Sequence, residues 1–358
     1  MNHLKKIFLS KKFFFTSAVL LAIFFGYKYM TAYKGEVEYV AFESDIRLEG
    51  VLTKPQSEGP HPAVIILQGS GGSHQEYDKL FNRFHANAFV EKGFAALAYT
   101  KRGSGNHDID YRYFTYKELM QDAMAALDFL HSRPDIDPDN IGIMAVSESG
   151  WFSPEMAIRD SNIRFVVNRV SSPFTVTRTL SHEIRMDAKV EGFTEEEVEQ
   201  VILPMHEDIW QYYIEAAKDL SQDRVDLRDS VNAQLSRLQQ HPKFGKWFTA
   251  PALSPYDPKL ITSRGMNYSY DPLPFLKSTD TPFLYVMGGK DRNMPSREII
   301  AFLEEFRVAE NKEIELKLYP EASHYLYKWS LRDGPFEGLY VEGYLELISS
   351  WALKQVQN

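Results

Sequence analysis

The sequence predicts an α/β protein with a mostly parallel, doubly wound β-sheet, an antiparallel hairpin at its N-terminal end, and a helical insertion. Short apolar segments recur along the chain between turn residues, and amphipathic helical patterns separate them. Strands that alternate with helices in this way are typical of a parallel sheet with helices on both faces. With 358 residues, the chain is long enough for one large domain that carries an inserted subdomain.

The first two expected strands form the hairpin, because VEYVAF and IRLEGVL flank the turn residues Ser44 and Asp45. Later strands are apolar on both sides, as strands must be when helices cover both faces of a sheet. They are expected at 63–67, 94–99, 141–146, 165–170, 283–288 and 314–319. A helix is expected over 116–132, where apolar side chains recur at helical spacing.

Residues 174–270 interrupt this alternation. No strand-like segment occurs there, and two long segments are typical of helices. Thr194 opens the first of them, with Glu197 three residues later, which is the pattern of a capping box. We expect this interval to be a helical lid over the strand ends, inserted into an α/β core made of residues 35–173 and 271–358.

Residues 1–34 are expected to lie outside the folded domain. Four lysines precede the uncharged apolar run FFFTSAVLLAIFFG at 13–26, and this order is typical of an export signal or a membrane anchor. No small-x-small cleavage site follows, because Met30 stands where a small residue is needed. We therefore expect an uncleaved, single-pass transmembrane anchor in the cell membrane with the folded domain outside the cytoplasm. Cleavage would instead give a secreted protein.

Composition excludes several classes of function. The formal net charge is −9, and no basic patch occurs beyond the N-terminus, which argues against nucleic acid as a partner. The chain has no cysteine, so disulfides, thiolate nucleophiles and cysteine-based metal sites are excluded.

The stretch AVSESGW, residues 145–151, contains the first candidate for a catalytic side chain. Ser147 follows the strand-like IGIMAV and precedes a segment that can start a helix. A tight turn between strand and helix needs small side chains two residues to either side, and Ala145 and Ser149 satisfy this requirement. Ser149 is a rival nucleophile, but it would place the bulky Trp151 at a flanking position. We therefore prefer Ser147.

Two further candidates follow later strands of the predicted sheet. Asp291 lies in MGGKD after FLYVM, and His324 lies in ASHYL after IELKLY. Each has an ordinary structural interpretation, as a turn former or a surface histidine. Their joint placement favours chemistry, because the active site of a parallel α/β sheet lies at the carboxyl ends of its strands.

The loop QGSGG after the strand at 63–67 is a candidate oxyanion hole. Its glycines at 69, 71 and 72 let backbone amides face a substrate oxygen. A phosphate loop is the alternative, but the Lys-Ser/Thr of a P-loop and the spacing of a dinucleotide site are both missing. The expected donors are the backbone N–H groups of Ser70 and Glu148.

From about residue 36 to 350 the chain resembles the α/β-hydrolase superfamily, within it the bacterial serine esterases related to dienelactone hydrolases and prolyl-oligopeptidase catalytic domains. YTKRGSGNH resembles the family's YDKRGxGxS, IGIMAVSESGWFSP resembles IGLxGxSxGGWxAP, MGGKDRNMP resembles GxxDxxVP, and ASHYL resembles xxHGL. The resemblance assigns the nucleophile to Ser147, the acid to Asp291 and the base to His324. Their order in the chain is the order found in α/β-hydrolases.

This sequence departs from the family pattern at several positions, among them Thr100, which replaces an aspartate. Gln68 replaces a histidine before GSGG, and Ala145 and Ser149 replace the two glycines of the elbow. The resemblance implies the α/β-hydrolase fold and a serine hydrolase that acts on a small-molecule carboxylic ester or thioester, most simply a carboxylesterase. Neither a metal nor an organic cofactor is expected. Two alternatives stay open, namely an exported serine peptidase of the prolyl-oligopeptidase type and a catalytically silent binding protein with this fold.

Overall fold

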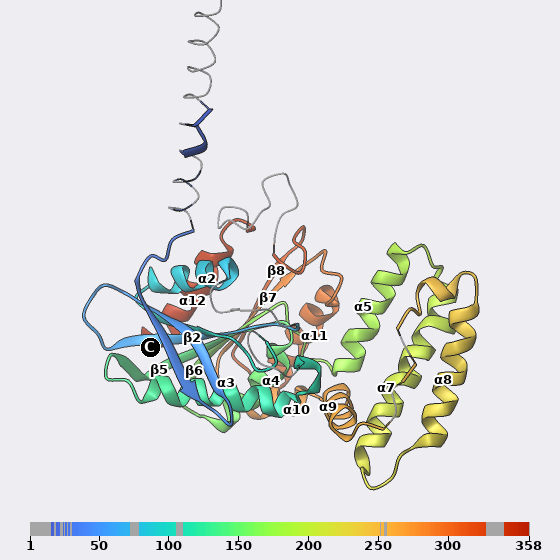
Figure 1. Cartoon of the computed structure of the whole chain (residues 1–358). Helices are drawn as coiled ribbons and strands as arrows, with labels where there is room; N and C mark the ends of the chain where they lie inside the picture. The colour runs from blue at the N-terminus through green and yellow to red at the C-terminus, as the bar shows by residue number, and fades with distance from the viewer. Residues whose placement is uncertain are drawn as a thin grey trace, which may run out of the picture.

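The structure of the chain is a computed structural model, shown in Figure 1. It describes residues 31–71, 79–104, 110–250, 252–253, 256–326 and 340–357, together with scattered positions between 16 and 28.

An eight-stranded, mostly parallel sheet forms the centre of the fold, in the order β1-β2-β4-β3-β5-β6-β7-β8. The first pair is the expected antiparallel hairpin, β2 pairs antiparallel with β4, and all later neighbours are parallel. The predicted fold class is therefore confirmed. The strands are β1 (Glu36–Glu43), β2 (Arg47–Lys54), β3 (His61–Leu67), β4 (Ala95–Tyr99), β5 (Ile136–Val146), β6 (Ile163–Arg169), β7 (Phe283–Gly288) and β8 (Ile314–Tyr319).

Helices cover both faces of the sheet, and two separate apolar clusters fill the space between them. One face carries α3 (Tyr116–His131), α4 (Ser149–Arg159), α10 (Leu273–Ser278) and α11 (Ser296–Ala309). The other carries α2 (Leu80–Val90) and α12 (Tyr344–Gln357). Strands from β3 to β7 are buried on both faces, which is why they read as continuous apolar segments rather than alternating ones.

Between β6 and β7 the chain forms a group of helices with an apolar cluster of its own. They are α5 (Val176–Val190), α6 (Glu195–Glu197), the π-helical turn η3 (Val198–Ile202), α7 (Leu203–Lys218), α8 (Val225–Gln240), the 3-10 turn η4 (Phe244–Lys246) and α9 (Pro258–Tyr268). Figure 1 shows α7 and α8 at the side of the molecule, beyond α5 and α9. The capping box of Thr194 and Glu197 is present. That these helices act as a lid stays a prediction.

Asn267 in α9 joins these helices to the α/β core. Its Oδ1 accepts a hydrogen bond from the backbone N–H of Tyr116 at 2.8 Å, and its Nδ2 donates to the carbonyl of Phe114 at 3.0 Å. The Tyr116 N–H is one of the donors at the start of α3 that a helix N-terminus otherwise leaves without partners. This contact fixes α9 at the edge of the region where the strands end.

The expectation of a membrane anchor at the N-terminus is corrected. Crossing the hydrocarbon core of a bilayer takes about 20 consecutive apolar residues in a helix. In the part of the chain that the structure describes, no helix has the length and the apolar character that this requires. Half of the apolar run at 13–26 lies outside the described residues.

Candidate active site

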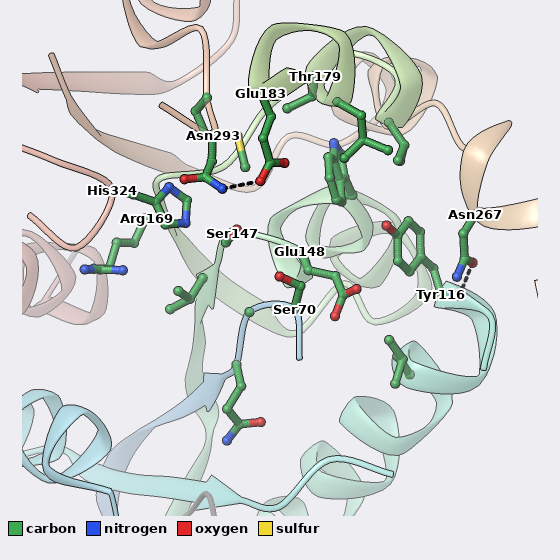
Figure 2. Close-up of a pocket in the computed structure, with 18 of the residues that line it drawn as sticks. Ser70, Tyr116, Ser147, Glu148, Arg169, Thr179, Glu183, Asn267, Asn293 and His324 are labelled. Carbon is green, nitrogen blue, oxygen red and sulfur yellow. Dashed lines mark hydrogen bonds between the residues drawn. The ribbon is translucent and has the colours of Figure 1, made fainter. Parts of the chain in front are cut away.

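A cavity of about 560 Å³ opens where the central strands end. Core segments and insertion helices line it together. Ser70, Ser147, Glu148 and His324 come from the loops after β3, β5 and β8, whereas Thr179 and Glu183 come from α5 (Figure 2). Four of the five predicted site residues therefore line this cavity, and the fifth, Asp291, contacts His324.

Ser147 occupies the sharp turn between β5 and α4. Its φ angle is 52°, in the left-handed region that residues other than glycine adopt only under constraint. The Ser147 backbone N–H donates to the Arg169 carbonyl at 2.9 Å, which joins the turn to the end of β6. Gly150 is required here, because a Cβ at this position would overlap the Ser171 hydroxyl. The turn therefore presents Ser147 to the cavity.

Ser149, the rival nucleophile, is buried and 1% exposed. Its Oγ accepts a hydrogen bond from the Val146 N–H at 2.7 Å. It also lies 3.1 Å from the Val146 carbonyl and 3.3 Å from the Leu67 carbonyl, to either of which the hydroxyl can donate. This hydroxyl therefore stabilises the turn from beneath and is not directed toward a substrate.

Asp291 and His324 are brought together by the turns after β7 and β8. His324 Nδ1 lies 2.8 Å from Asp291 Oδ2. The other carboxylate oxygen accepts hydrogen bonds from the backbone N–H groups of Asn293, at 2.8 Å, and Met294, at 3.0 Å. With Nδ1 donating to the carboxylate, the tautomer that leaves Nε2 available as a base is favoured. The Asp291 side chain is fully buried, and these three hydrogen-bond partners hold it in place.

Gly288 and Gly289 allow the two turns to approach this closely. A Cβ at Gly288 would overlap the carbonyl oxygens of Ala322 and Ser323, and one at Gly289 would overlap the backbone of Pro320. The Lys290 N–H donates to the Ala322 carbonyl at 2.8 Å. Close packing of the two turns therefore explains the paired glycines of MGGKD, whatever the role of Asp291.

Ser147 and His324 lie at the same cavity, but no hydrogen bond joins their side chains in the described structure. A nucleophile and its base often make a long contact in the absence of substrate and close it only when substrate binds. The structure therefore joins Asp291 and His324 by a hydrogen bond and places Ser147 at the same cavity as His324.

The two predicted oxyanion donors flank Ser147. Ser70 follows β3, and Glu148 is the residue before the first turn of α4. Within the described residues, neither backbone N–H donates to another group of the protein. Free amides at the start of a helix attract negative charge. Gly71 adopts a φ angle of 85°, which favours glycine, while Gly72 lies outside the described residues.

Lys101 is a site residue that the sequence interpretation missed. Its Nζ donates to Glu148 Oε2 at 2.8 Å and to the Gly69 carbonyl at 2.6 Å, so one ammonium group joins the loops that carry both amides. The two side chains are only 6% and 13% exposed. The only indication in the sequence was the position of this lysine, in YTKRG, just after a buried strand. No sequence feature linked it to Glu148.

Glu183 on α5 is a second residue that was missed. Asn293 Nδ2 donates to its carboxylate at 2.6 Å, as Figure 2 shows. Burial raises the pKa of Glu183, and the neighbouring charge of Asp187 raises it further. The insertion helices thus bring a half-buried carboxyl group to the end of the cavity where His324 lies.

An aromatic wall forms the opposite end of the cavity. The rings of Tyr116 and Trp151 stack with their centroids 5.7 Å apart, and Tyr268 from α9 also lines this part. Gln68 lies outside this wall, where its Nε2 donates to the Tyr99 carbonyl at 2.5 Å. Within the described ranges, no group of three or more histidine, aspartate or glutamate side chains is arranged to hold a metal ion.

The Lys101–Glu148 pair predicts strong coupling between two substitutions. Lys101→Met leaves a buried carboxylate without its cation and should lower the free energy of unfolding by about 3–5 kcal/mol. Adding Glu148→Gln removes that charge, so the double variant should be more stable than the sum of the single changes predicts. Urea denaturation of the four proteins measures this. Additive effects would show that the pair does not hold the two loops together.

Glu183 predicts a pH dependence of stability. Because its folded pKa is raised above the unfolded value, the ionised form is disfavoured by folding at neutral pH. Glu183→Gln should therefore be more stable than wild type at pH 7, and the difference should vanish as the pH falls below about 4.5. Urea denaturation of Glu183→Gln and of wild type at several pH values measures this difference in stability.

Glu199→Gln is a control for which the expected change in stability at pH 7 has the opposite sign. A hydrogen bond from Arg185 lowers the pKa of Glu199, so Glu199→Gln should destabilise the protein at pH 7 and lose that effect as the pH falls. If both variants responded to pH in the same direction, the burial argument for Glu183 would be wrong.

Known proteins to which the sequence is similar include a thioesterase and an esterase. No protein-family model matches the sequence. Mouse acyl-coenzyme A thioesterase 1 is 25% identical over 283 residues, which is 78% of this chain and 52% of that protein. Esterase EstD of Thermotoga maritima is 30% identical over 125 residues, 33% of this chain and 29% of that esterase. The chain thus spans about half the length, or less, of these curated relatives.

Solved structures agree with the fold. A Pyrococcus furiosus esterase aligns with a TM-score of 0.54 at 15% identity, covering 90% of this chain and 91% of the esterase. A Pyrococcus horikoshii acylaminoacyl peptidase aligns with the same TM-score and identity, covering 91% of this chain but 42% of the peptidase. Together with the sheet order, these similarities show that the chain has the α/β-hydrolase fold.

Proposed function

We propose that this protein is a serine hydrolase that cleaves a carboxylic ester or thioester through an acyl-enzyme on Ser147. The observation that supports it best is the buried Asp291–His324 pair, which lies at the same cavity as a serine held at a φ angle of 52°. The names of the curated relatives, which are thioesterases and esterases, are consistent with this chemistry.

In the proposed first step, Ser147 Oγ attacks the acyl carbon while His324 Nε2 takes the hydroxyl proton. Asp291 holds the ring in the required tautomer and stabilises the imidazolium that forms. The backbone N–H groups of Ser70 and Glu148 donate to the developing oxyanion, and such a donor contributes on the order of a hundredfold or more in rate.

When the tetrahedral intermediate collapses, the bond to the leaving alcohol or thiol breaks, and His324 returns its proton to that group. A water molecule then attacks the acyl carbon, His324 accepts its proton, and the acid is released with Ser147 regenerated. The leaving group must therefore lie on the side of Ser147 where His324 is.

We further propose that the helices of 174–270 select the substrate. Thr179 and Glu183 of α5 and Tyr268 of α9 line the cavity, although the nucleophile and its partners all belong to the core. The aromatic wall offers an apolar site for the acyl chain. A peptidase activity is the second candidate, because one similar structure is an acylaminoacyl peptidase.

Labelling with a fluorophosphonate probe tests the nucleophile, because only an activated serine reacts with it. Wild type should be labelled, and Ser147→Ala should lose labelling. Ser149→Ala is the matched control and should keep it, although loss of its hydrogen bonds to the turn should lower the melting temperature. Equal labelling of Ser147→Ala and wild type would refute the assignment, and no labelling of a folded wild type would favour the silent binding protein.

A substrate series tests the acyl site. The kcat/KM for p-nitrophenyl esters should rise about fourfold per methylene from acetate onward until the aromatic wall is filled, because each buried methylene contributes about 0.8 kcal/mol. Tyr268→Ala should reduce the increase in kcat/KM per added methylene. Thioesters of N-acetylcysteamine should be cleaved, whereas alanyl p-nitroanilide should react at least about tenfold more slowly than the best ester. Preference for the anilide would select the peptidase instead.

A further inference from the structure

Arg169 is a buried cation at the cavity that the proposed mechanism does not use. It is the last residue of β6, pairs in register with Val146 of β5, and is only 2% exposed. Its side chain lines the same cavity as Ser147 and His324. The strand end that carries Arg169 adjoins the turn of the proposed nucleophile, because the Arg169 carbonyl accepts the N–H of Ser147.

Two of the three guanidinium nitrogens of Arg169 have no hydrogen-bond acceptor among the described residues. Nε and Nη2 of Arg169 are buried without a partner, and no carboxylate forms an ion pair with the side chain among the described residues. A buried charge is normally paired, because removing it from water is strongly unfavourable. The planar donor fork of an arginine matches a carboxylate, which can accept two parallel hydrogen bonds.

The groups around Arg169 leave its positive charge uncompensated. Its guanidinium carbon lies 5.0 Å from the centre of the Phe81 ring and 5.8 Å from that of Tyr344. His85 lies between the same elements, with Nε2 2.8 Å from the Tyr344 hydroxyl. Burial, together with the charge of Arg169, lowers the pKa of His85 to about 3, so this imidazole is neutral. Ring faces attract a cation weakly, and none of these groups supplies a negative charge.

The position of Arg169 indicates which part of a substrate it meets. Figure 2 shows Arg169 on the same side of Ser147 as His324, whereas Glu148 and Tyr116 lie on the other side. The Val341 N–H donates to the Leu326 carbonyl, which ties the loop of His324 to the start of α12, where Tyr344 packs against Arg169. In the proposed reaction, the leaving group occupies the side where His324 lies, because His324 must protonate it.

We propose that Arg169 binds a carboxylate carried by the leaving alcohol or thiol of the substrate. This inference rests on the proposed function, since it uses the side on which His324 acts. One guanidinium balances one negative charge, which fits a carboxylate better than a dianionic phosphate. A carboxylate in this position would complete the missing half of a buried ion pair.

Two esters that share an acetyl group test the inference: 4-acetoxybenzoate, whose leaving phenol carries a carboxylate, and its methyl ester, which is neutral. Arg169→Met should lower the ratio of kcat/KM for the charged over the neutral ester by about tenfold to a hundredfold, because a buried charge-assisted contact is lost. Arg169→Lys should restore part of that ratio. The exposed Arg178, whose side chain contacts Phe174 and Glu298, is the control, and Arg178→Met should leave the ratio at its wild-type value.

Binding to a protein without the nucleophile separates this inference from the proposed function. Ser147→Ala should bind benzoate more tightly than benzamide in calorimetry, and this preference should disappear in Ser147→Ala/Arg169→Met. If the ester ratio is unchanged in Arg169→Met, or if benzoate has no advantage over benzamide, Arg169 is not a carboxylate site. If Ser147→Ala hydrolyses esters like wild type, the proposed nucleophile is wrong, whatever the outcome with benzoate. Should Arg169→Met not fold, the benzoate preference of Ser147→Ala decides the question alone.

Discussion

The strained junction at the carboxyl ends of β5 and β6 is the constraint on which the candidate site depends. Ser147 and Val170 both adopt left-handed backbone conformations, at φ angles of 52° and 46°, and such a conformation is unusual for a β-branched residue. The strain persists because both strands hold it. The Ser147 N–H donates across to β6, the Val170 N–H donates to Val286 of β7 at 2.8 Å, and the Ser149 hydroxyl stabilises the turn from below. The direction of the Ser147 side chain is thereby set by the sheet.

Around this junction, the charged groups differ in how fully they are paired. Asp291 has three partners, and Glu148 is joined to Lys101 in an almost buried pair, so both are fixed before any ligand arrives. Glu183 accepts a hydrogen bond from Asn293 but forms no ion pair among the described residues, and within the same residues Nε and Nη2 of Arg169 have no acceptor. Paired charges cost nothing further to desolvate, whereas unpaired ones gain most from a ligand group. The charged groups next to Ser147 and His324 are therefore held by protein partners, whereas Arg169 is left to bind a group of the substrate.

The sequence predicted the parts of this structure that local patterns encode. Every expected strand is present, and the hairpin flanks Ser44 and Asp45 as expected, because apolar segments between turn residues specify strands that are buried on both faces. The predicted nucleophile, acid and base end close together, since the carboxyl ends of parallel strands share one edge. Their catalytic roles stay a prediction.

What could not be predicted depends on contacts between residues far apart in the chain. Lys101 meets Glu148 across 47 positions, and Asn293 meets Glu183 across 110. Arg169 belongs to an apolar strand segment, and no nearby residue in the sequence indicated that its side chain would be buried at the cavity. Together the proposals divide the cavity into an aromatic end for an acyl chain and an end with Arg169 for a leaving group. A substrate that fits both ends must have an apolar acyl group and an anionic leaving group. An ester that has only one of these features would use only part of the site.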